Sequence, residues 1–410
     1  MLKRIFKTSF YSIVARFFIT SGNLAVVYYI SKNFDKASLG LYGIAFFFYQ
    51  FFQSFSSMGM PIYIGKEIAS SRESTKKTIN VFHQFILANF YGLLSSFVIL
   101  FIAIVFYHRL SVSLLVLAFI AGFLLGIERN LSGFLLGKER MNLESLANFI
   151  EFLLLFIPLF IIPNDFFKTI AAIFILRILS LIVGVLLRLY FLKDMLSFKG
   201  FEFKFKTFKE VKFYWFSGLS YLFFRQIDVF ILSFFFAKAL IGEYFLSIRI
   251  FFAVGILAEV VSLALTPFIS RVYNDKEEIS FEKFRNLIFS ISLVIGVFLG
   301  GFLYVFREPL ISFFNKSLIK ACSPYLALLS IAIPFRFLIY ILGSFMSSSK
   351  FQNVRLYLNI AWAFFFMIIV FIFVNIFSIK GAIYSKILTE FFLFITYFYF
   401  VFFRMRVKKQ

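Results

Sequence analysis

Cysteine, histidine and acidic residues are scarce in this chain. Cys322 is its only cysteine, and its two histidines, His83 and His108, are 25 positions apart (108 − 83). An intrachain disulfide and a cysteine-based metal site are therefore excluded, and we expect no metal site on the histidines. Only 20 Asp and Glu face 42 Lys and Arg, which leaves a net charge of +22. A polar stretch long enough to form a soluble domain is also missing.

Apolar residues dominate the composition instead. They make up 61% of the 410 residues, and the mean hydropathy is +0.93. A soluble domain carries about 45–50% apolar residues, so the excess predicts that lipid surrounds much of the surface. In a soluble protein the basic charge would suggest nucleic acid. In a membrane protein it is typical of cytoplasmic loops beside anionic lipid, so we expect membrane lipid as a partner and no nucleic acid.

About twelve apolar segments are long enough to cross a bilayer, because a span needs about 20 such residues. They lie near 9–31, 40–62, 83–106, 112–133, 145–163, 169–190, 213–236, 242–268, 286–306, 323–347, 355–375 and 380–403. The predicted fold class is therefore an all-α integral membrane protein of about twelve transmembrane helices.

Lysine and arginine are concentrated in one set of connections, which predicts the orientation. These connections are the two termini and the segments near 63–82, 134–144, 188–212, 269–285 and 348–355. The positive-inside rule then places both termini in the cytoplasm. The longest of these connections divides the chain, so we predict an N-terminal lobe of six spans (1–192), a cytoplasmic basic linker (193–212) and a C-terminal lobe of six spans (213–410).

The two halves also share an order of motifs. NFDKASLGLY follows the first span and FFAKALIGEY the seventh, so Gly40 and Tyr42 correspond to Gly242 and Tyr244. A proline ends the next apolar run in each half. Because each predicted half has an even number of spans, the repeat is parallel, and the lobes are expected to be related by a pseudo-twofold axis along the membrane normal. Transporters that alternate access between two lobes commonly have this architecture.

Charged side chains inside the spans are candidate functional residues, because a charge at the centre of a span costs about 2.5–3.5 kcal/mol on insertion scales. The candidates for substrate binding are Arg16, Arg177, Arg225, Arg249 and Arg336, and those for ion coupling are Asp228 and Glu259. A surplus of guanidinium groups favours a phosphate-bearing anion, whereas cationic drugs would favour the opposite balance.

Several of these charges also have a purely structural interpretation. Arg16 is near enough to the end of its span to snorkel to the headgroups. Arg225 and Asp228 lie three residues apart on one helix face and form either an ion pair that locks packing or part of a cargo site. The spacing of Lys386 and Glu390 predicts that they pair with each other. The remaining charges, Glu128, Arg129 and Glu151, are expected near the cytoplasmic ends of their spans.

Three segments carry a resemblance to a known family: NFDKASLGLYGIA (33–45), RQIDVFILSFFFAKALIGEYFLSIRI (225–250) and LTPFISRVYND (265–275). With twelve spans and a central basic loop, the chain resembles the polysaccharide-transport branch of the multidrug/oligosaccharidyl-lipid/polysaccharide flippase superfamily, whose familiar members are the Wzx-like O-antigen flippases.

The resemblance implies a transporter and not an enzyme. Such proteins move a polyprenyl-pyrophosphate-linked oligosaccharide from the cytoplasmic to the periplasmic leaflet of a bacterial inner membrane by alternating access. It implies a cavity between the lobes that contains Arg225, Asp228, Arg249 and Arg16. No cofactor is expected beyond an H⁺ or Na⁺ gradient, and membrane proteins of polysaccharide assembly are expected partners.

Alternatives from two classes stay open. A multidrug exporter of the same superfamily would need a predominantly acidic cavity. A membrane glycan ligase or polymerase would need a sizeable extracytoplasmic loop with catalytic groups, and the longest connection on that side, near 307–322, has no paired carboxylates.

Overall fold

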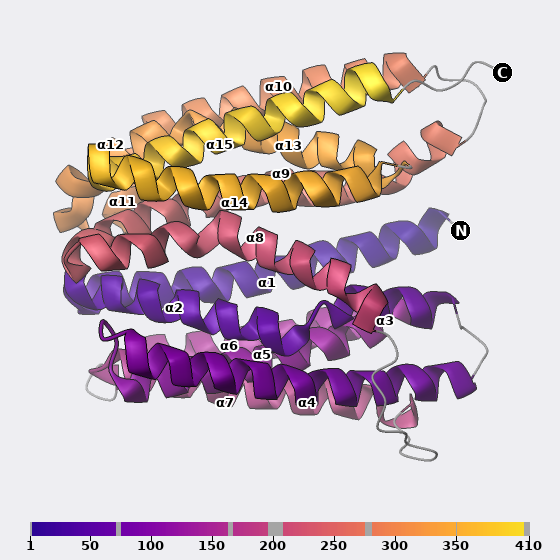
Figure 1. Ribbon diagram of the computed structural model, residues 1–410, viewed down its shortest axis with the longest axis horizontal. Helices are drawn as coiled ribbons and strands as arrows, with labels where there is room; N and C mark the ends of the chain where they lie inside the picture. Colours follow the sequence, from indigo (N-terminus) through magenta and orange to yellow (C-terminus); the bar gives the residue numbers. More distant parts are fainter. Residues whose placement is uncertain are drawn as a thin grey trace. The chain divides into compact units, whose positions relative to one another are not determined.

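The computed structural model describes residues 2–70, 75–162, 167–195, 208–274, 281–349 and 351–405, and these ranges are almost entirely helical, without a β-strand (Figure 1). In the first part of the chain the helices are α1 (Leu2–Asn33), α2 (Lys36–Ser57), α3 (Met60–Ser70), α4 (Thr75–Phe106), α5 (Val112–Gly137), α6 (Met141–Ile161), α7 (Ile170–Phe191) and the short η2 (Lys193–Met195). Those that follow are α8 (Phe208–Phe235), α9 (Lys238–Asn274), α10 (Phe281–Val305), α11 (Arg307–Phe314), η3 (Lys316–Leu318), α12 (Ile319–Ser330), α13 (Ala332–Ser347), α14 (Gln352–Phe377), α15 (Ile379–Tyr399) and η4 (Phe400–Arg404).

The predicted all-α membrane fold is confirmed. Among the described residues, ten helices are long and apolar enough to cross a membrane, and an eleventh span results if α12 and α13, with η3, are counted together despite their 44° bend. The predicted span at 40–62 corresponds to α2 and the start of α3. Much of α2 is buried in protein, and it contains Gln53 and several serines. It is therefore less apolar than the ten helices and is not counted among them.

The chain divides by its contacts into two compact units, Met1–Gln226 (unit 1) and Ile227–Gln410 (unit 2). This division falls inside α8, whereas the predicted C-terminal lobe begins at residue 213. The reason is that the first half of α8 packs within unit 1. Trp215 meets Phe55 edge-to-face at 5.2 Å between ring centroids, and its backbone lies so close to Gly59, which has φ +72°, that a side chain at position 59 would overlap it. Most of the predicted linker, residues 196–207, lies outside the described residues.

In unit 1, α5 is the central helix, and α2, α3, α4 and α7 pack against it. Glycines on α5 allow the close approach, because a Cβ at Gly122 would lie 2.5 Å from the carbonyl oxygen of Tyr49 on α2, and one at Gly133 would lie 2.7 Å from that of Pro61 on α3. Small residues commonly serve this purpose where membrane helices pack tightly. The remaining helices of this unit continue the bundle, since α1 packs on α6 and α6 packs on α7.

In unit 2, α13 has the corresponding central role, with α9, α10 and α15 packed against it and α14 against α15. The motif positions also correspond. Tyr42 and Tyr244 each lie six residues after the first residue of α2 and α9, and Arg177 and Lys386 each lie seven residues after the first residue of α7 and α15. This shared order supports an internal repeat, while the axis that would relate the halves stays a prediction.

Candidate functional site

Asp228 lies at the centre of a buried polar cluster in unit 2. Its Oδ2 accepts a hydrogen bond of 2.6 Å from the hydroxyl of Tyr244 and lies 3.2 Å from Lys386 Nζ, while Oδ1 accepts from the Val229 N–H. Asp228 and Lys386 have no exposed side-chain surface. The Lys386 ammonium also lies 4.2 Å from the ring centroid of Phe366, which adds a cation–π contact. Helices α8, α9 and α15 therefore meet at this carboxylate.

A second ion pair lies beside the first. Arg336 Nη1 donates to Glu390 Oε1 at 2.5 Å, and both residues are buried. The Arg336 guanidinium lies 4.6 Å from the ring centroid of Phe252. It has room because Gly255 has no side chain, and a Cβ there would come within 2.9 Å of Arg336 Nε. The sequence predicts that Lys386 pairs with Glu390, whereas each of them forms its ion pair with a residue of another helix.

The other candidates on α8 and α9 are Arg225, Arg249 and Glu259, and they differ in burial and in the groups they contact. Arg225 donates to the hydroxyl of Tyr221 at 2.6 Å, one turn earlier on α8. The carboxylate of Asp228, its predicted partner, is engaged by Tyr244 and Lys386. Arg249 is buried on α9 and lies 4.5 Å from the ring centroid of Phe245, and Glu259, farther along α9, is half-buried.

Arg177 occupies the corresponding place in unit 1. It is buried on α7, its guanidinium lies 5.3 Å from the Tyr49 ring centroid, and Nη1 donates to the Tyr49 hydroxyl at 3.4 Å. Its Nε and Nη2 are buried and have no hydrogen-bond partner among the described residues. Arg16, the other candidate of this unit, is half-buried on α1. Tyr42, also on α2, interacts with the Arg177 guanidinium. Arg177 is therefore the candidate with two buried nitrogens outside the hydrogen bonds of the described residues.

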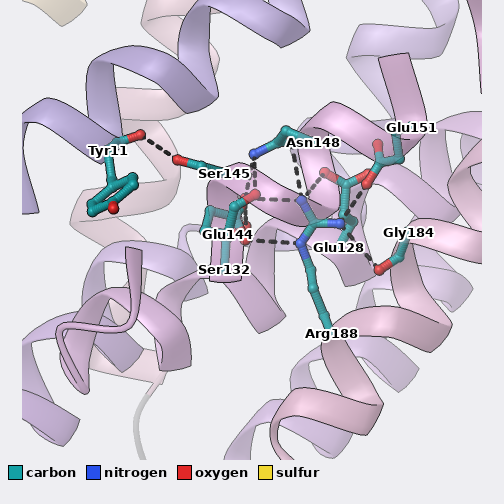
Figure 2. A network of polar contacts seen from close by, with 9 residues as sticks. All are labelled: Tyr11, Glu128, Ser132, Glu144, Ser145, Asn148, Glu151, Gly184 and Arg188. Atoms are coloured by element: carbon teal, nitrogen blue, oxygen red, sulfur yellow. Dashed lines mark hydrogen bonds and ion pairs between the residues drawn. The ribbon is translucent and has the colours of Figure 1, made fainter. Parts of the chain in front are cut away.

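Arg188 was missed by the sequence interpretation, which assigns it to a cytoplasmic connection. It is instead fully buried within α7, where Glu144 accepts two hydrogen bonds of 2.9 Å from its Nε and Nη2 (Figure 2). Nη2 also lies 3.3 Å from Glu128 Oε1, and Nη1 lies 2.5 Å from Glu151 Oε1. The prediction for Arg188 is wrong because a charge at the end of an apolar run looks like a loop residue when its partners on other helices are unknown.

Neutral groups complete this cluster. Arg188 donates to Asn148 Oδ1 and to the carbonyl oxygen of Gly184, both at 3.1 Å, and the Ser132 hydroxyl donates to Glu144 Oε1 at 2.6 Å (Figure 2). A signal was present in the sequence, because Glu144, Asn148 and Glu151 follow an i, i+4, i+7 spacing that puts them on one face of α6.

Comparison with solved structures identifies the fold. An inward-facing multidrug resistance MATE family transporter of the MOP superfamily matches with a TM-score of 0.75 and 14% identity over 94% of both chains. An outward-facing conformation of such a transporter matches with a TM-score of 0.72 and 17% identity, covering 98% of this chain and 95% of the other. A MOP superfamily transporter from Pyrococcus furiosus, described as having a binding pocket of reverse polarity, matches with a TM-score of 0.66 and 16% identity over 98% and 95%. The protein is thus a multi-pass membrane protein with the fold of the MOP superfamily transporters.

Family comparison gives a narrower placement. The model of the polysaccharide biosynthesis protein family matches residues 5–273, so the chain belongs to that family. The MatE family model also matches residues 214–373. A comparison with curated proteins finds no match.

Proposed function

We propose that this protein is a flippase that moves a polyprenyl-pyrophosphate-linked oligosaccharide, such as an O-antigen or another surface polysaccharide unit, from the cytoplasmic to the periplasmic leaflet by alternating access. The observation that carries the proposal is the family match over residues 5–273 of a chain whose helices suit a membrane. Sugars assembled on a lipid at the cytoplasmic face must cross the bilayer, and a bundle of membrane helices with a transporter fold suits that step better than an enzymatic one.

The chemistry of Arg177 supports an anionic cargo. A buried guanidinium group with unused donors is unfavourable unless a ligand receives them, and its planar fork matches the oxygens of a phosphate. The aromatic rings beside Arg177 and Arg249 hold each guanidinium from one face. We therefore assign the pyrophosphate contact to Arg177 first, with Arg249, Arg225, Arg336 and Arg16 as further cargo-binding candidates.

A protein with this function lies in a bacterial inner membrane with both termini in the cytoplasm. Its proposed partners are membrane proteins of polysaccharide assembly. The excess of basic residues in one set of connections supports this orientation. Reporters that are active only in the periplasm, fused at Gly200 and at Asn315, test it. We expect silence at Gly200 and activity at Asn315, and the reverse pattern would overturn the topology.

A multidrug exporter is the second candidate, because the MatE model matches 214–373 and two of the similar structures are described as multidrug resistance transporters. Its cargo would be cationic, and the carboxylates of the bundle would bind it. Ion coupling through Asp228 or Glu259 is a proposal that applies to both candidates.

Reconstitution into lipid vesicles separates the two candidates. The flippase predicts protein-dependent movement of a fluorescent polyprenyl-pyrophosphate oligosaccharide between leaflets. We expect Arg177→Ala to slow this movement at least about tenfold, since a hydrogen bond to a charged group contributes about 1.5–3 kcal/mol. Arg177→Lys should recover only part of the rate, because an ammonium group cannot bind bidentately. Arg109→Ala, an exposed arginine in a connection, is the matched control. Export of a cationic dye without movement of the labelled lipid would favour the multidrug exporter and reject the flippase.

A further inference from the structure

We propose that Arg188, Glu128, Glu144 and Glu151, here called the Arg188 network, form a proton-binding site in unit 1, in which Glu128 and Glu151 share one exchangeable proton. The use of this proton in transport rests on the proposed function. The binding of the proton is a property of the chain and can be tested separately.

The first argument is the balance of charge. Arg188 is the one cation in direct contact with three carboxylates, as far as the described residues show. Glu144 accepts hydrogen bonds from Nε and Nη2 of Arg188 and further ones from Ser132 and Asn148. It is therefore the carboxylate that is best stabilised as an anion. Arg188 and Glu144 together are neutral, and the carboxylates of Glu128 and Glu151 remain without a cation of their own in the described part of the chain.

The second argument comes from Glu128. Its side chain is only 2% exposed, and its Oε2 is buried without a hydrogen-bond partner among the described residues. An ionised carboxylate with an orphaned oxygen loses several kcal/mol of solvation on burial. Binding a proton removes this penalty, because the neutral carboxylic acid is far easier to bury. Glu151 contacts the same guanidinium as Glu128, through Nη1 where Glu128 contacts Nη2, so one proton on either carboxylate reduces the repulsion between the two.

Other titratable groups lie on the helices that pack around the network. On α2, the Tyr49 hydroxyl accepts a hydrogen bond from Arg177, and α5 carries Arg129 next to Glu128. Helix α1 contributes the carbonyl oxygen of Tyr11, which accepts from Ser145, and the half-buried Arg16. Helix α4, which packs on α5, carries the buried His83 and the exposed Tyr91, and α3 carries Lys66 and Glu67.

Unit 2 provides an internal comparison. Two of its buried carboxylates, Asp228 and Glu390, each contact a cation of their own, Lys386 and Arg336. That arrangement is neutral with every group ionised and needs no proton. The surplus of carboxylates in unit 1 therefore singles out the Arg188 network, and not Asp228, as the place where a proton is taken up.

The position of the network suggests how a proton would act on the fold. Its members come from α5, α6 and α7, and Ser145 extends the contacts to α1 (Figure 2). Loss of the proton adds a negative charge between helices that pack closely, so it favours a looser arrangement that admits water. Gly184 sets the geometry, because a methyl group at that position would overlap the carboxylate of Glu151.

Infrared spectroscopy of the purified protein tests the site without any cargo. A carboxylic acid gives a C=O band that its ionised form lacks, and ordinary carboxyl groups are ionised between about pH 6 and about pH 9. We expect a protonated-carboxyl band that loses intensity across this range in the wild type. The band should be lost in Glu128→Gln and in Glu151→Gln, which keep the side-chain shape, and kept in Glu282→Gln, a change at an exposed position on α10. Absence of the band in the wild type, or its persistence in both network variants, would overturn the proposal.

A second variant keeps every carboxylate in place. Gly184→Ala should displace Glu151 from Arg188 and shift the pH midpoint of the band by about one unit, and an unchanged midpoint would argue against Glu151 as a member of the proton site. The vesicle assay then separates the two proposals. A titrating band without movement of the labelled lipid supports the proton site and rejects the flippase. Movement of the lipid without a titrating band supports the flippase and rejects the proton site.

Discussion

Replacing Arg188 with methionine is expected to destabilise unit 1 severely. Methionine keeps an apolar stem of similar length but removes the cation that contacts Glu144, Glu128 and Glu151. Removing one partner of a buried ion pair costs about 3–5 kcal/mol, because the other charge stays buried. Proton uptake by the stranded carboxylates limits the loss, so we expect about 4 kcal/mol near neutral pH and less in acid.

The measurement is the free energy of unfolding of the purified protein, obtained by titration with a denaturing detergent. Arg225→Met is the matched control. Its guanidinium bonds to Tyr221 on the same helix at a partly exposed site, so its loss should be about 1 kcal/mol. Adding Glu144→Gln to Arg188→Met removes one stranded charge and should recover part of the stability. If Arg188→Met alone unfolds within about 1 kcal/mol of the wild type, the energetic reasoning about this network is wrong.

Two further predictions concern the helices themselves. Gly92→Ala should destabilise unit 1 by about 1–3 kcal/mol in the same titration, because the new methyl group would lie 2.6 Å from the carbonyl oxygen of Ser56. Gly301→Ala, with nothing within 4 Å of its methyl group, should be neutral or slightly stabilising, and equal losses would refute the packing argument. Asp35 caps α2 by accepting from the Ser38 N–H, so Asp35→Ala should cost about 1 kcal/mol. Hydrogen bonds from Ser38 hold the pKa of Asp35 below its ordinary value. The cap therefore contributes fully above about pH 4 and is lost as pH falls through the folded-state pKa. Thermal unfolding is therefore measured above about pH 4 and again below the folded-state pKa of Asp35. The unfolding temperature of Asp35→Ala should be lower than that of the wild type only at the higher pH.

Much of the fold could be predicted because lipid imposes a simple rule. Backbone groups in a bilayer must bond internally, so each long apolar run has to form a helix. The runs at 112–133 and 169–190 became α5 and α7 with ends that differ by a few residues. The run at 40–62 shows where the rule weakens. It contains α2, the break at Met58 and Gly59, and the start of α3, since a helix buried in protein is under no pressure to be continuous or uniformly apolar.

The partners of the buried charges could not be predicted, because they are set by tertiary packing. The sequence offers Asp228 an ion pair with Arg225, three residues away, or a place in a cargo site, but Asp228 contacts Lys386, which is 158 positions farther along the chain (386 − 228). Local spacing describes only contacts along one helix. The spacing of Glu144 and Glu151 on α6 did carry usable information, since a polar stripe on an otherwise apolar helix indicates a buried polar partner.

Three of the buried arginines, Arg188, Arg336 and Arg177, differ in how far their donors are already occupied. Arg188 has its donors filled by carboxylates, an amide and a carbonyl group, so an anionic cargo would have to displace them. Arg336 is paired with Glu390, and a phosphate could bind it only in exchange for that carboxylate. Arg177 keeps two buried nitrogens without partners among the described residues, each at a cost of about 1–3 kcal/mol. Against a total stability of about 5–15 kcal/mol, such a cost is hard to retain for packing alone. Under the proposed function, a pyrophosphate group that accepts hydrogen bonds from both nitrogens removes this cost.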